Sequence, residues 1–341
     1  LAIHGVQAAR GADHIHAGPA AHGVVAPAPQ GPVVAAIGDQ DVVAVLALLV
    51  VIGAGAVHYL TTSDSAGPSS PEGPESGQPP EESQPEWCPS VEFISAPGTW
   101  ESAADDDPLN PSANPRSFML SITQPLQEAY GDDVKVWTLP YTAQFKNINA
   151  QEEMSYDDSR DEGTAKMNEE LRGMHDSCPQ TKFILSGFSQ GAVIAGDVAD
   201  DIGGGEGVIP AENIAGVALI ADGRRENGVG QNPGHELGGI GAEIALEPVS
   251  GLVQPIVPGA TMRGARPHGF GELADRTFQI CAPNDTVCDA PTGVGNGLER
   301  AKDLIGANGV HAQYADNGGV IEGTTANQWV VDWAHGVIDA V

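Results

Sequence analysis

A serine flanked by two glycines stands between two apolar runs in residues 184–193, ILSGFSQGAV. The run before the serine has the pattern of a buried strand, and the run after it has the pattern of a helix. Residues 187–191 fit G-x-S-x-G, in which a tight strand-to-helix turn holds the serine in strained geometry above the edge of a sheet. The segment therefore predicts that Ser189 is a nucleophile, and a glycine-rich turn whose serine caps a helix is the alternative interpretation.

Expected strands and helices alternate throughout residues 87–341. Apolar strands that alternate with helices indicate a mainly parallel sheet covered on both faces, so the expected fold class is α/β. Residues 203–275 are rich in Gly and Pro apart from one strand, and we expect a long surface excursion there, either a lid or an insertion. The expected strands are residues 91–96, 134–139, 182–187, 213–222 and 277–282, and the expected helices are residues 117–131 with an interruption at Pro125, 160–175, 190–202, a helix near 298–305 and a final helix from Ala326.

The first 86 residues differ from this pattern in composition. Residues 42–60 are almost entirely apolar, and as a helix they span about 28 Å, close to the thickness of a bilayer's hydrocarbon core. We expect a transmembrane or signal-anchor helix there, and a cleaved signal peptide is the alternative. Residues 1–41 are expected to be a disordered leader, and residues 61–86, rich in Pro, Ser, Glu and Gly, a disordered linker, so the folded domain spans residues 87–341.

The charge of the chain restricts its possible binding partners, and its cysteine content indicates the redox state of its compartment. The chain has 46 acidic and 15 basic residues, a formal net charge of -31, which repels phosphates and excludes a nucleic-acid partner. The spacing of its four cysteines does not suit a structural zinc site, so we expect two disulfides and an oxidising compartment. The cysteines are Cys88, Cys178, Cys281 and Cys288.

A serine nucleophile needs a carboxylate and a histidine, which follow it in the order serine, acid, histidine on this architecture. Two acids follow expected strand ends, Asp222 and Asp285. Asp285 is the better candidate, because it lies between two cysteines whose bridging would fix its backbone. Asp222 can instead pair with Arg224 or Arg225.

The histidines that follow Asp285 are His311 and His335. His311 lies in an irregular stretch between two expected helices, where a base can reach into a site. His335 falls within the amphipathic final helix, where a surface or structural role is more usual. We therefore favour His311 as the base.

Three features together resemble the cutinase family, specifically the cutinase-like esterases of the actinobacterial cell envelope. They are GFSQGA around Ser189, Cys178 eleven residues before that serine, and the C-x3-D-x2-C arrangement of residues 281–288. The resemblance covers residues 87–341 and implies a small α/β-hydrolase, a three-layer sandwich around a mainly parallel sheet.

The resemblance also implies roles for individual residues. It maps the triad onto Ser189, Asp285 and His311, and the disulfides onto Cys88–Cys178 and Cys281–Cys288. In the family, a hydroxyl from the loop after the first strand completes the oxyanion hole together with the amide that follows the serine. That loop reads SAPGTWES, so Thr99 and Gln190 are the candidates.

These inferences predict a serine carboxylesterase or lipase that works through an acyl-enzyme and needs no metal or organic cofactor. The expected substrate is a neutral lipid or acyl ester of the cell envelope, and the expected enzyme is a monomer, membrane-anchored with an extracytoplasmic catalytic domain or secreted. An acyltransferase acting on envelope lipids is the first alternative, because the triad does not decide whether water or another alcohol accepts the acyl group. A non-catalytic wall-anchored binding protein is the second.

Overall fold

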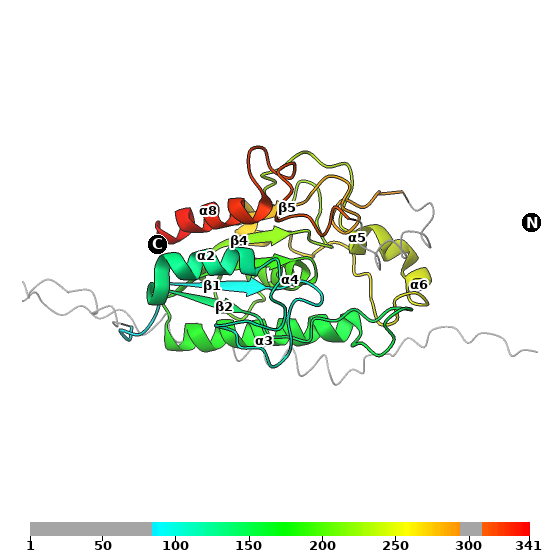
Figure 1. The fold of residues 1–341 in the computed structure, drawn as a ribbon. Coiled ribbons are helices and arrows are strands. Elements are labelled where there is room, and N and C mark those ends of the chain that lie inside the picture. Colours follow the sequence, from blue (N-terminus) through cyan, green and yellow to red (C-terminus); the bar gives the residue numbers. More distant parts are fainter. Residues whose placement is uncertain (1–83, 294–308) are drawn as a thin grey trace, which may run out of the picture. The chain divides into compact units, whose positions relative to one another are not determined.

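The computed structural model describes residues 84–293 and 309–341 (Figure 1). The predicted leader, the predicted membrane span at 42–60, most of the predicted linker and the helix expected near 298–305 lie outside the described residues. Within the described part of the chain, no helix is both long and apolar enough to cross a membrane.

Five parallel strands form one sheet in the order β2-β1-β3-β4-β5. Most of their residues are buried, because helices cover both faces of the sheet, and this explains why β3 and β4 read as nearly continuous apolar runs rather than alternating ones. The prediction of an α/β fold with a parallel sheet is therefore confirmed. The strands are β1 (Val91–Ala96), β2 (Val134–Thr138), β3 (Lys182–Phe188), β4 (Ile214–Ile220) and β5 (Thr277–Ile280).

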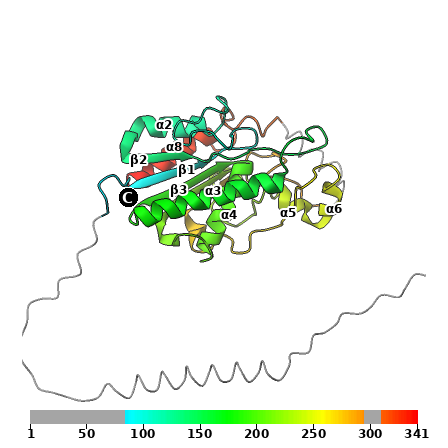
Figure 2. The ribbon, with the colours of Figure 1, turned by 90° about the horizontal axis from the view of Figure 1, so that it is seen from below.

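Within residues 84–293 and 309–341, four long helices form the two outer layers (Figures 1 and 2). Helices α2 (Leu120–Tyr130) and α8 (Ala326–Ile338) cover one face, and α3 (Tyr156–Ser177) and α4 (Gln190–Gly203) cover the other. The shorter helices are α5 (Ala242–Leu246) and α6 (Ser250–Val253), with 3-10 turns η1 (Gly131–Asp133), η2 (Ala211–Asn213), η3 (Glu247–Val249) and η4 (Gly271–Arg276).

Adjacent residues of β1 point into different cores. Phe93 packs in the core beneath α2 and α8, and Ile94 packs in the core beneath α3 and α4, and both are fully buried. This alternation follows from the two-residue period of a strand. The central sheet thereby joins the two helical layers into one rigid support for the loops at its edge.

Helix α2 corrects one prediction, because it continues through Pro125 instead of being interrupted there. Proline removes one backbone hydrogen bond, but Pro125 lies on the exposed side, where water can solvate the carbonyl left without a partner. The opposite side of the helix buries Ile122 and Leu126. Packing of that apolar side outweighs the local cost of the proline.

The segment expected to be a surface excursion is largely packed, which corrects a second prediction. It contains α5 and α6, and it forms a small hydrophobic cluster of its own around Val253 and Val257, joined by Tyr156 of α3. Arg224, Arg225 and Arg266 of the same segment are also buried. Gly and Pro content did not indicate this packing, because the contacts are made with residues distant in the sequence.

Candidate active site

The predicted site residues come from loops at one edge of the sheet. Thr99 follows β1, Ser189 follows β3, Asp285 follows β5, and His311 lies before α8. Because all five strands are parallel, these loops meet at the carboxyl ends of the strands, where α/β proteins place their sites.

The turn at Ser189 has the strained geometry that the glycine pattern predicts. Ser189 has φ 54° and ψ -117°, a conformation that few residues other than glycine adopt. A Cβ atom at Gly187 would lie 2.3 Å from the Gly191 carbonyl oxygen, and one at Gly191 would lie 2.0 Å from the Ala96 carbonyl oxygen. Both glycines are therefore required, because β3, β1 and the start of α4 approach too closely for any side chain.

The hydroxyl of Ser189 lies at the end of a hydrogen-bonded chain of three residues. Its Oγ is 2.9 Å from Nε2 of His311, and Nδ1 of the same ring is 2.9 Å and 3.1 Å from the two carboxylate oxygens of Asp285. Asp285 is fully buried, and the imidazole stacks on Phe188, the residue before the serine. This arrangement lets the imidazole accept the serine proton while the carboxylate fixes the ring's orientation.

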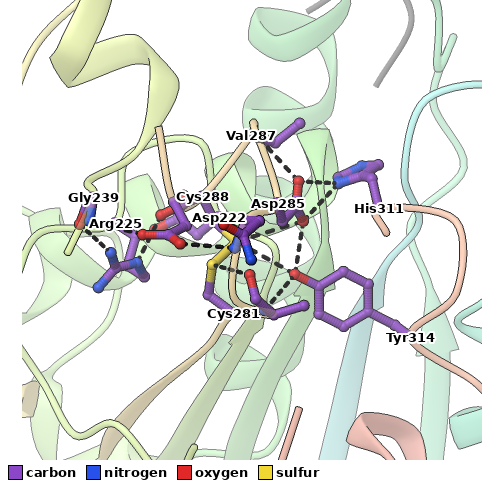
Figure 3. Close-up of a disulfide and its surroundings, with 12 residues drawn as sticks. Asp222, Arg225, Gly239, Cys281, Asp285, Val287, Cys288, His311 and Tyr314 are labelled. Atoms are coloured by element: carbon purple, nitrogen blue, oxygen red, sulfur yellow. Dashed lines mark hydrogen bonds and ion pairs between the residues drawn. A yellow bond between two sulfur atoms is a disulfide. The ribbon is translucent and has the colours of Figure 1, made fainter. Parts of the chain in front are cut away.

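Asp285 is held by contacts on several sides (Figure 3). The Tyr314 hydroxyl donates to its Oδ2 at 2.7 Å, and the Val287 amide donates to its Oδ1 at 3.0 Å. The disulfide Cys281–Cys288 closes the short loop that carries it. The carboxylate is thus oriented by hydrogen bonds and by a covalent constraint on its backbone.

The two oxyanion-hole candidates lie side by side. The hydroxyl of Thr99 donates to Oε1 of Gln190 at 3.0 Å, although 91 residues separate the two positions. The backbone amide of Gln190 is at the first position of α4, where helical N–H groups have no acceptor within the helix. Such amides are suited to binding negative charge that develops on a neighbouring oxygen.

The alternative triad candidates are engaged elsewhere. Asp222 forms a buried ion pair with Arg266 and also accepts the backbone N–H of Arg224, so its cationic partner differs from the two neighbours considered from the sequence. His335, on α8, forms a hydrogen bond of 2.9 Å with the hydroxyl of Tyr130. The structure therefore brings Asp285 and His311 to Ser189, and neither alternative residue.

A cavity of about 720 Å³ adjoins the serine. Its size falls in the range of small-molecule sites, about 300–1,000 Å³. Most of its wall is apolar, and its polar groups include the buried carboxylate of Glu243 and the half-buried carboxylate of Glu101. The wall includes Thr99, Glu101, Phe118, Phe145, Ser189, Gln190, Val193, Glu243, Met262, Val287 and His311.

The sequence model described as Cutinase matches residues 87–332. The chain belongs to the cutinase family. It is 66% identical over 303 residues to a protein of Corynebacterium glutamicum named "Carboxylesterase Culp6 homolog", a match that covers 87% of this chain and 97% of that relative. These matches confirm the predicted family and the predicted class of carboxylic ester hydrolase.

Among solved structures, two matches each cover about three quarters of this chain. A cutinase-like protein from Cryptococcus sp. has a TM-score of 0.44 and 20% sequence identity, and the match covers 75% of this chain and 98% of that one. An acetyl xylan esterase has a TM-score of 0.43 and 15% identity, and the match covers 74% and 99%.

Two residues of the candidate site were not predicted from the sequence, Tyr314 and Glu101. Tyr314 has the weak signal of lying three residues after His311, but its contact with Asp285 depends on the loop's path. Glu101 accepts hydrogen bonds from the Gly98 and Phe118 amides and so fixes the loop that carries Thr99. Burial raises the pKa of Glu101, although those hydrogen bonds act in the opposite direction.

Removing the Tyr314 hydroxyl tests its positioning role in the cutinase site. We expect Tyr314→Phe to lower kcat about tenfold with little change in KM, because the fully buried carboxylate of Asp285 loses a hydrogen-bond donor. The measurement is steady-state hydrolysis of a p-nitrophenyl ester. Tyr130→Phe is the matched control, since that hydroxyl contacts Asp339 and His335 outside the site. Equal kcat values for the two variants would contradict the role.

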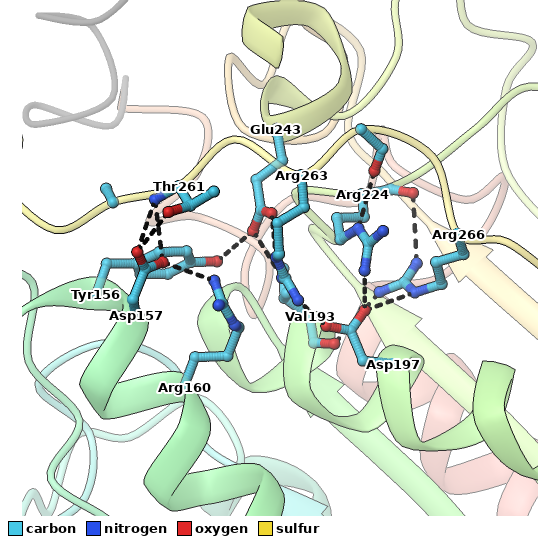
Figure 4. Close-up of polar contacts among 12 residues, drawn as sticks. Tyr156, Asp157, Arg160, Val193, Asp197, Arg224, Glu243, Thr261, Arg263 and Arg266 are labelled. Atoms are coloured by element: carbon cyan, nitrogen blue, oxygen red, sulfur yellow. Dashed lines mark hydrogen bonds and ion pairs between the residues drawn. The ribbon is translucent and has the colours of Figure 1, made fainter. Parts of the chain in front are cut away.

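A buried ion network attaches one wall of the cavity to α4 (Figure 4). Asp197 of α4 pairs with Arg224, Arg263 and Arg266. Arg263 also pairs with Glu243, whose carboxylate accepts the Tyr156 hydroxyl at 2.6 Å. Burial alone would raise the pKa of Asp197, but the three guanidinium groups outweigh it and lower that pKa. The network joins the helix that begins at the nucleophile to the segment that carries Glu243 and Met262.

Neutralising Asp197 should destabilise the fold. Asp197→Asn is expected to lower the free energy of unfolding by about 3 kcal/mol, because three guanidinium groups lose a shared counter-charge. Arg263 and Arg266 keep the carboxylates of Glu243 and Asp222, so the loss falls mainly on the buried Arg224. Asp161→Asn removes an exposed carboxylate that pairs with Arg160, and it should change the free energy of unfolding by less than about 0.5 kcal/mol. Because the pKa of Asp197 is lowered on folding, its contribution is present at neutral pH and is lost as the pH falls below its usual range. Urea unfolding at pH 7 and pH 3 measures both effects, and an equal loss at both pH values would contradict the assignment.

Among the described residues, one group of three side chains could hold a metal ion, namely Asp200, Asp201 and His268. It lies at the end of α4 opposite to Ser189. The Asp200 carboxylate accepts the backbone N–H groups of His268 and Phe270, so it already orders a turn near the end of the excursion.

Proposed function

We propose that this chain hydrolyses carboxylic esters through an acyl-enzyme formed on Ser189. The observation that carries the proposal is the hydrogen-bonded chain from Ser189 through His311 to Asp285 beside an apolar cavity. The membership of the cutinase family supports the same reaction class.

In the first half of the reaction, the Ser189 oxygen attacks the ester carbonyl while Nε2 of His311 accepts the hydroxyl proton. Asp285 stabilises the imidazolium that results. The carbonyl oxygen becomes an oxyanion, which accepts hydrogen bonds from the Gln190 amide and from Thr99. When the tetrahedral intermediate collapses, His311 returns the proton to the leaving alcohol, and the acyl group stays on Ser189.

In the second half, water replaces the alcohol. His311 takes a proton from the water as it attacks the acyl-enzyme, and it gives that proton back to the Ser189 oxygen as the acid leaves. The balance is one ester and one water converted to one acid and one alcohol.

The substrate class follows from the wall of the cavity. Phe118, Phe145 and Met262 offer apolar surface suited to an acyl chain. We propose neutral lipid or other acyl esters as substrates, since the net charge of -31 disfavours strongly anionic ones.

The catalytic domain is proposed to act outside the cytoplasm. Its disulfides, Cys88–Cys178 and Cys281–Cys288, are typical of oxidising compartments. Residues 42–60 would supply the membrane anchor, with the catalytic domain on the outer side.

Covalent labelling of the intact protein tests the proposed reaction. A fluorophosphonate should modify the chain at a single residue, and peptide mass spectrometry should locate the adduct on Ser189. p-Nitrophenyl esters of increasing chain length should be hydrolysed, with kcat/KM rising as the acyl chain fills the cavity. No turnover at any chain length and no adduct would favour the non-catalytic binding protein instead.

A further inference from the structure

The side chain of Gln190 makes contacts that its role as a backbone donor does not need. We propose that Ser159 of α3, acting through the side-chain amide of Gln190, positions the Thr99 hydroxyl for the oxyanion. Ser159 is then a positioning residue, remote in sequence from the triad and unconnected to any recognisable motif. The inference rests on the proposed ester hydrolysis.

Ser159 is a fixed anchor. It is fully buried, and its hydroxyl donates to the Thr142 carbonyl at 2.5 Å. That bond commits the only hydroxyl hydrogen, so the Ser159 oxygen can act only as an acceptor for its other neighbours. It accepts Nε2 of Gln190 at 2.9 Å and the Gln144 amide at 3.3 Å.

These contacts determine which way the Gln190 amide faces. Its Nε2 donates to the Ser159 oxygen and to the Gln144 carbonyl, at 2.9 Å and 3.4 Å. A flipped amide would place Oε1 against two oxygens that can offer it no hydrogen, so the hydrogen-bond network assigns one orientation. Oε1 therefore faces Thr99, whose hydroxyl donates to it at 3.0 Å.

The backbone around Thr99 is held independently. The Glu101 carboxylate accepts the Gly98 and Phe118 amides, and the Trp100 amide donates to the Ala143 carbonyl at 2.6 Å. Trp100 itself has φ 62°, a strained conformation that persists because these contacts hold the loop. With the loop fixed, the remaining freedom near the oxyanion is rotation of the Thr99 side chain, which Gln190 restrains.

This arrangement places the Thr99 oxygen before the reaction starts. In the resting protein its proton points to the neutral carbonyl of Gln190. When the oxyanion forms, rotation about the Cβ–Oγ bond alone redirects the proton, since a charged acceptor binds it more strongly than a neutral one. No heavy atom has to move, which is the condition under which an oxyanion hole is effective.

The test compares two buried serines. Ser159→Ala should lower kcat about tenfold and leave KM within about twofold, because a displaced oxyanion donor affects the transition state more than substrate binding. Ser186→Ala is the matched control, since the Ser186 hydroxyl is also buried and donates to a carbonyl, that of Ala218, but does not contact Gln190. The rate of fluorophosphonate labelling should fall by the same factor as kcat/KM, because the phosphonyl oxygen occupies the same site. Equal activity of the two variants would overturn the proposal.

A double-mutant cycle shows whether Ser159 acts through Thr99. Thr99→Val alone should lower kcat about 100-fold, in the range for loss of one oxyanion donor. In that background Ser159→Ala should have no further effect on kcat. If the two losses multiply instead, Ser159 acts by another route, and the proposed link from Ser159 through Gln190 to Thr99, the relay, is wrong. If Ser159→Ala lowers the Tm by several degrees, Gln190→Met tests the same link while keeping the backbone amide, and it should reproduce the tenfold loss. A Gln190→Met variant with unchanged kcat would overturn the relay as well.

The relay and the proposed function fail in different ways. If a Ser189→Ala variant keeps its activity and its labelling, the proposed ester hydrolysis at this site is wrong. If that variant is inactive while Ser159→Ala behaves like Ser186→Ala, only the relay is wrong.

Discussion

Ser189→Ala is expected to lower kcat for ester hydrolysis by about 10⁶, the size of effect produced by removing the nucleophile of a serine-histidine-aspartate triad. Alanine keeps the backbone of the turn but removes the hydroxyl oxygen that lies 2.9 Å from Nε2 of His311. No acyl-enzyme can then form, and any residual rate comes from substrate binding and the oxyanion donors alone. The measurement is hydrolysis of a p-nitrophenyl ester by wild type and variant at equal concentration.

Fluorophosphonate labelling and the Tm together distinguish loss of the nucleophile from loss of the fold. The Ser189→Ala variant should take up no fluorophosphonate, and its Tm should stay within a few degrees of the wild type. A variant that is labelled as fast as the wild type would remove Ser189 from its proposed role, whatever its esterase rate.

His311→Ala is expected to lower kcat by a similar factor, because it removes the base that lies 2.9 Å from the serine hydroxyl. His335→Ala provides the matched control, and its kcat should stay within about twofold of the wild type. Its imidazole contacts the Tyr130 hydroxyl between α2 and α8, and it does not line the cavity. Rates for both variants should be measured between pH 6 and pH 9, so that a shift in the pH optimum is not mistaken for a loss.

The reverse result is also informative. If His335→Ala abolishes activity and His311→Ala does not, the base has been assigned to the wrong histidine. If both variants keep most of their activity, the triad mechanism itself fails.

Local patterns account for the parts of the fold that were predicted from sequence. The five strands of the sheet were located, because each is a short segment rich in apolar residues and is followed by turn residues. The errors arose where distant contacts compete with local preference. Pro125 stays in a helix because the opposite side of α2 packs on the sheet, and residues around Val253 and Val257 are buried by Tyr156 of α3.

At the site, the sequence could identify reactive residue types but could not orient them. G-x-S-x-G requires close backbone approach, so the turn at Ser189 was predictable, and Gly187 and Gly191 are too crowded for any side chain. The choice of His311 over His335 rested on the expected helix boundaries. Nothing local linked Tyr314 to Asp285 or Ser159 to Gln190.

The sequence by itself determined the α/β fold class, the cutinase family and the serine turn, because these depend on periodicity, spacing and backbone sterics within short segments. The sequence favoured Asp285 and His311, but only the tertiary structure brings them to hydrogen-bonding distance of each other and of Ser189, since the three groups lie on loops far apart in the chain. The tertiary structure also decided that Asp197 binds three arginines and that Ser159 lies behind the oxyanion donors. Hydrogen bonds and ion pairs depend on direction and on distances of about 3 Å, and only the folded chain sets these between residues far apart in sequence.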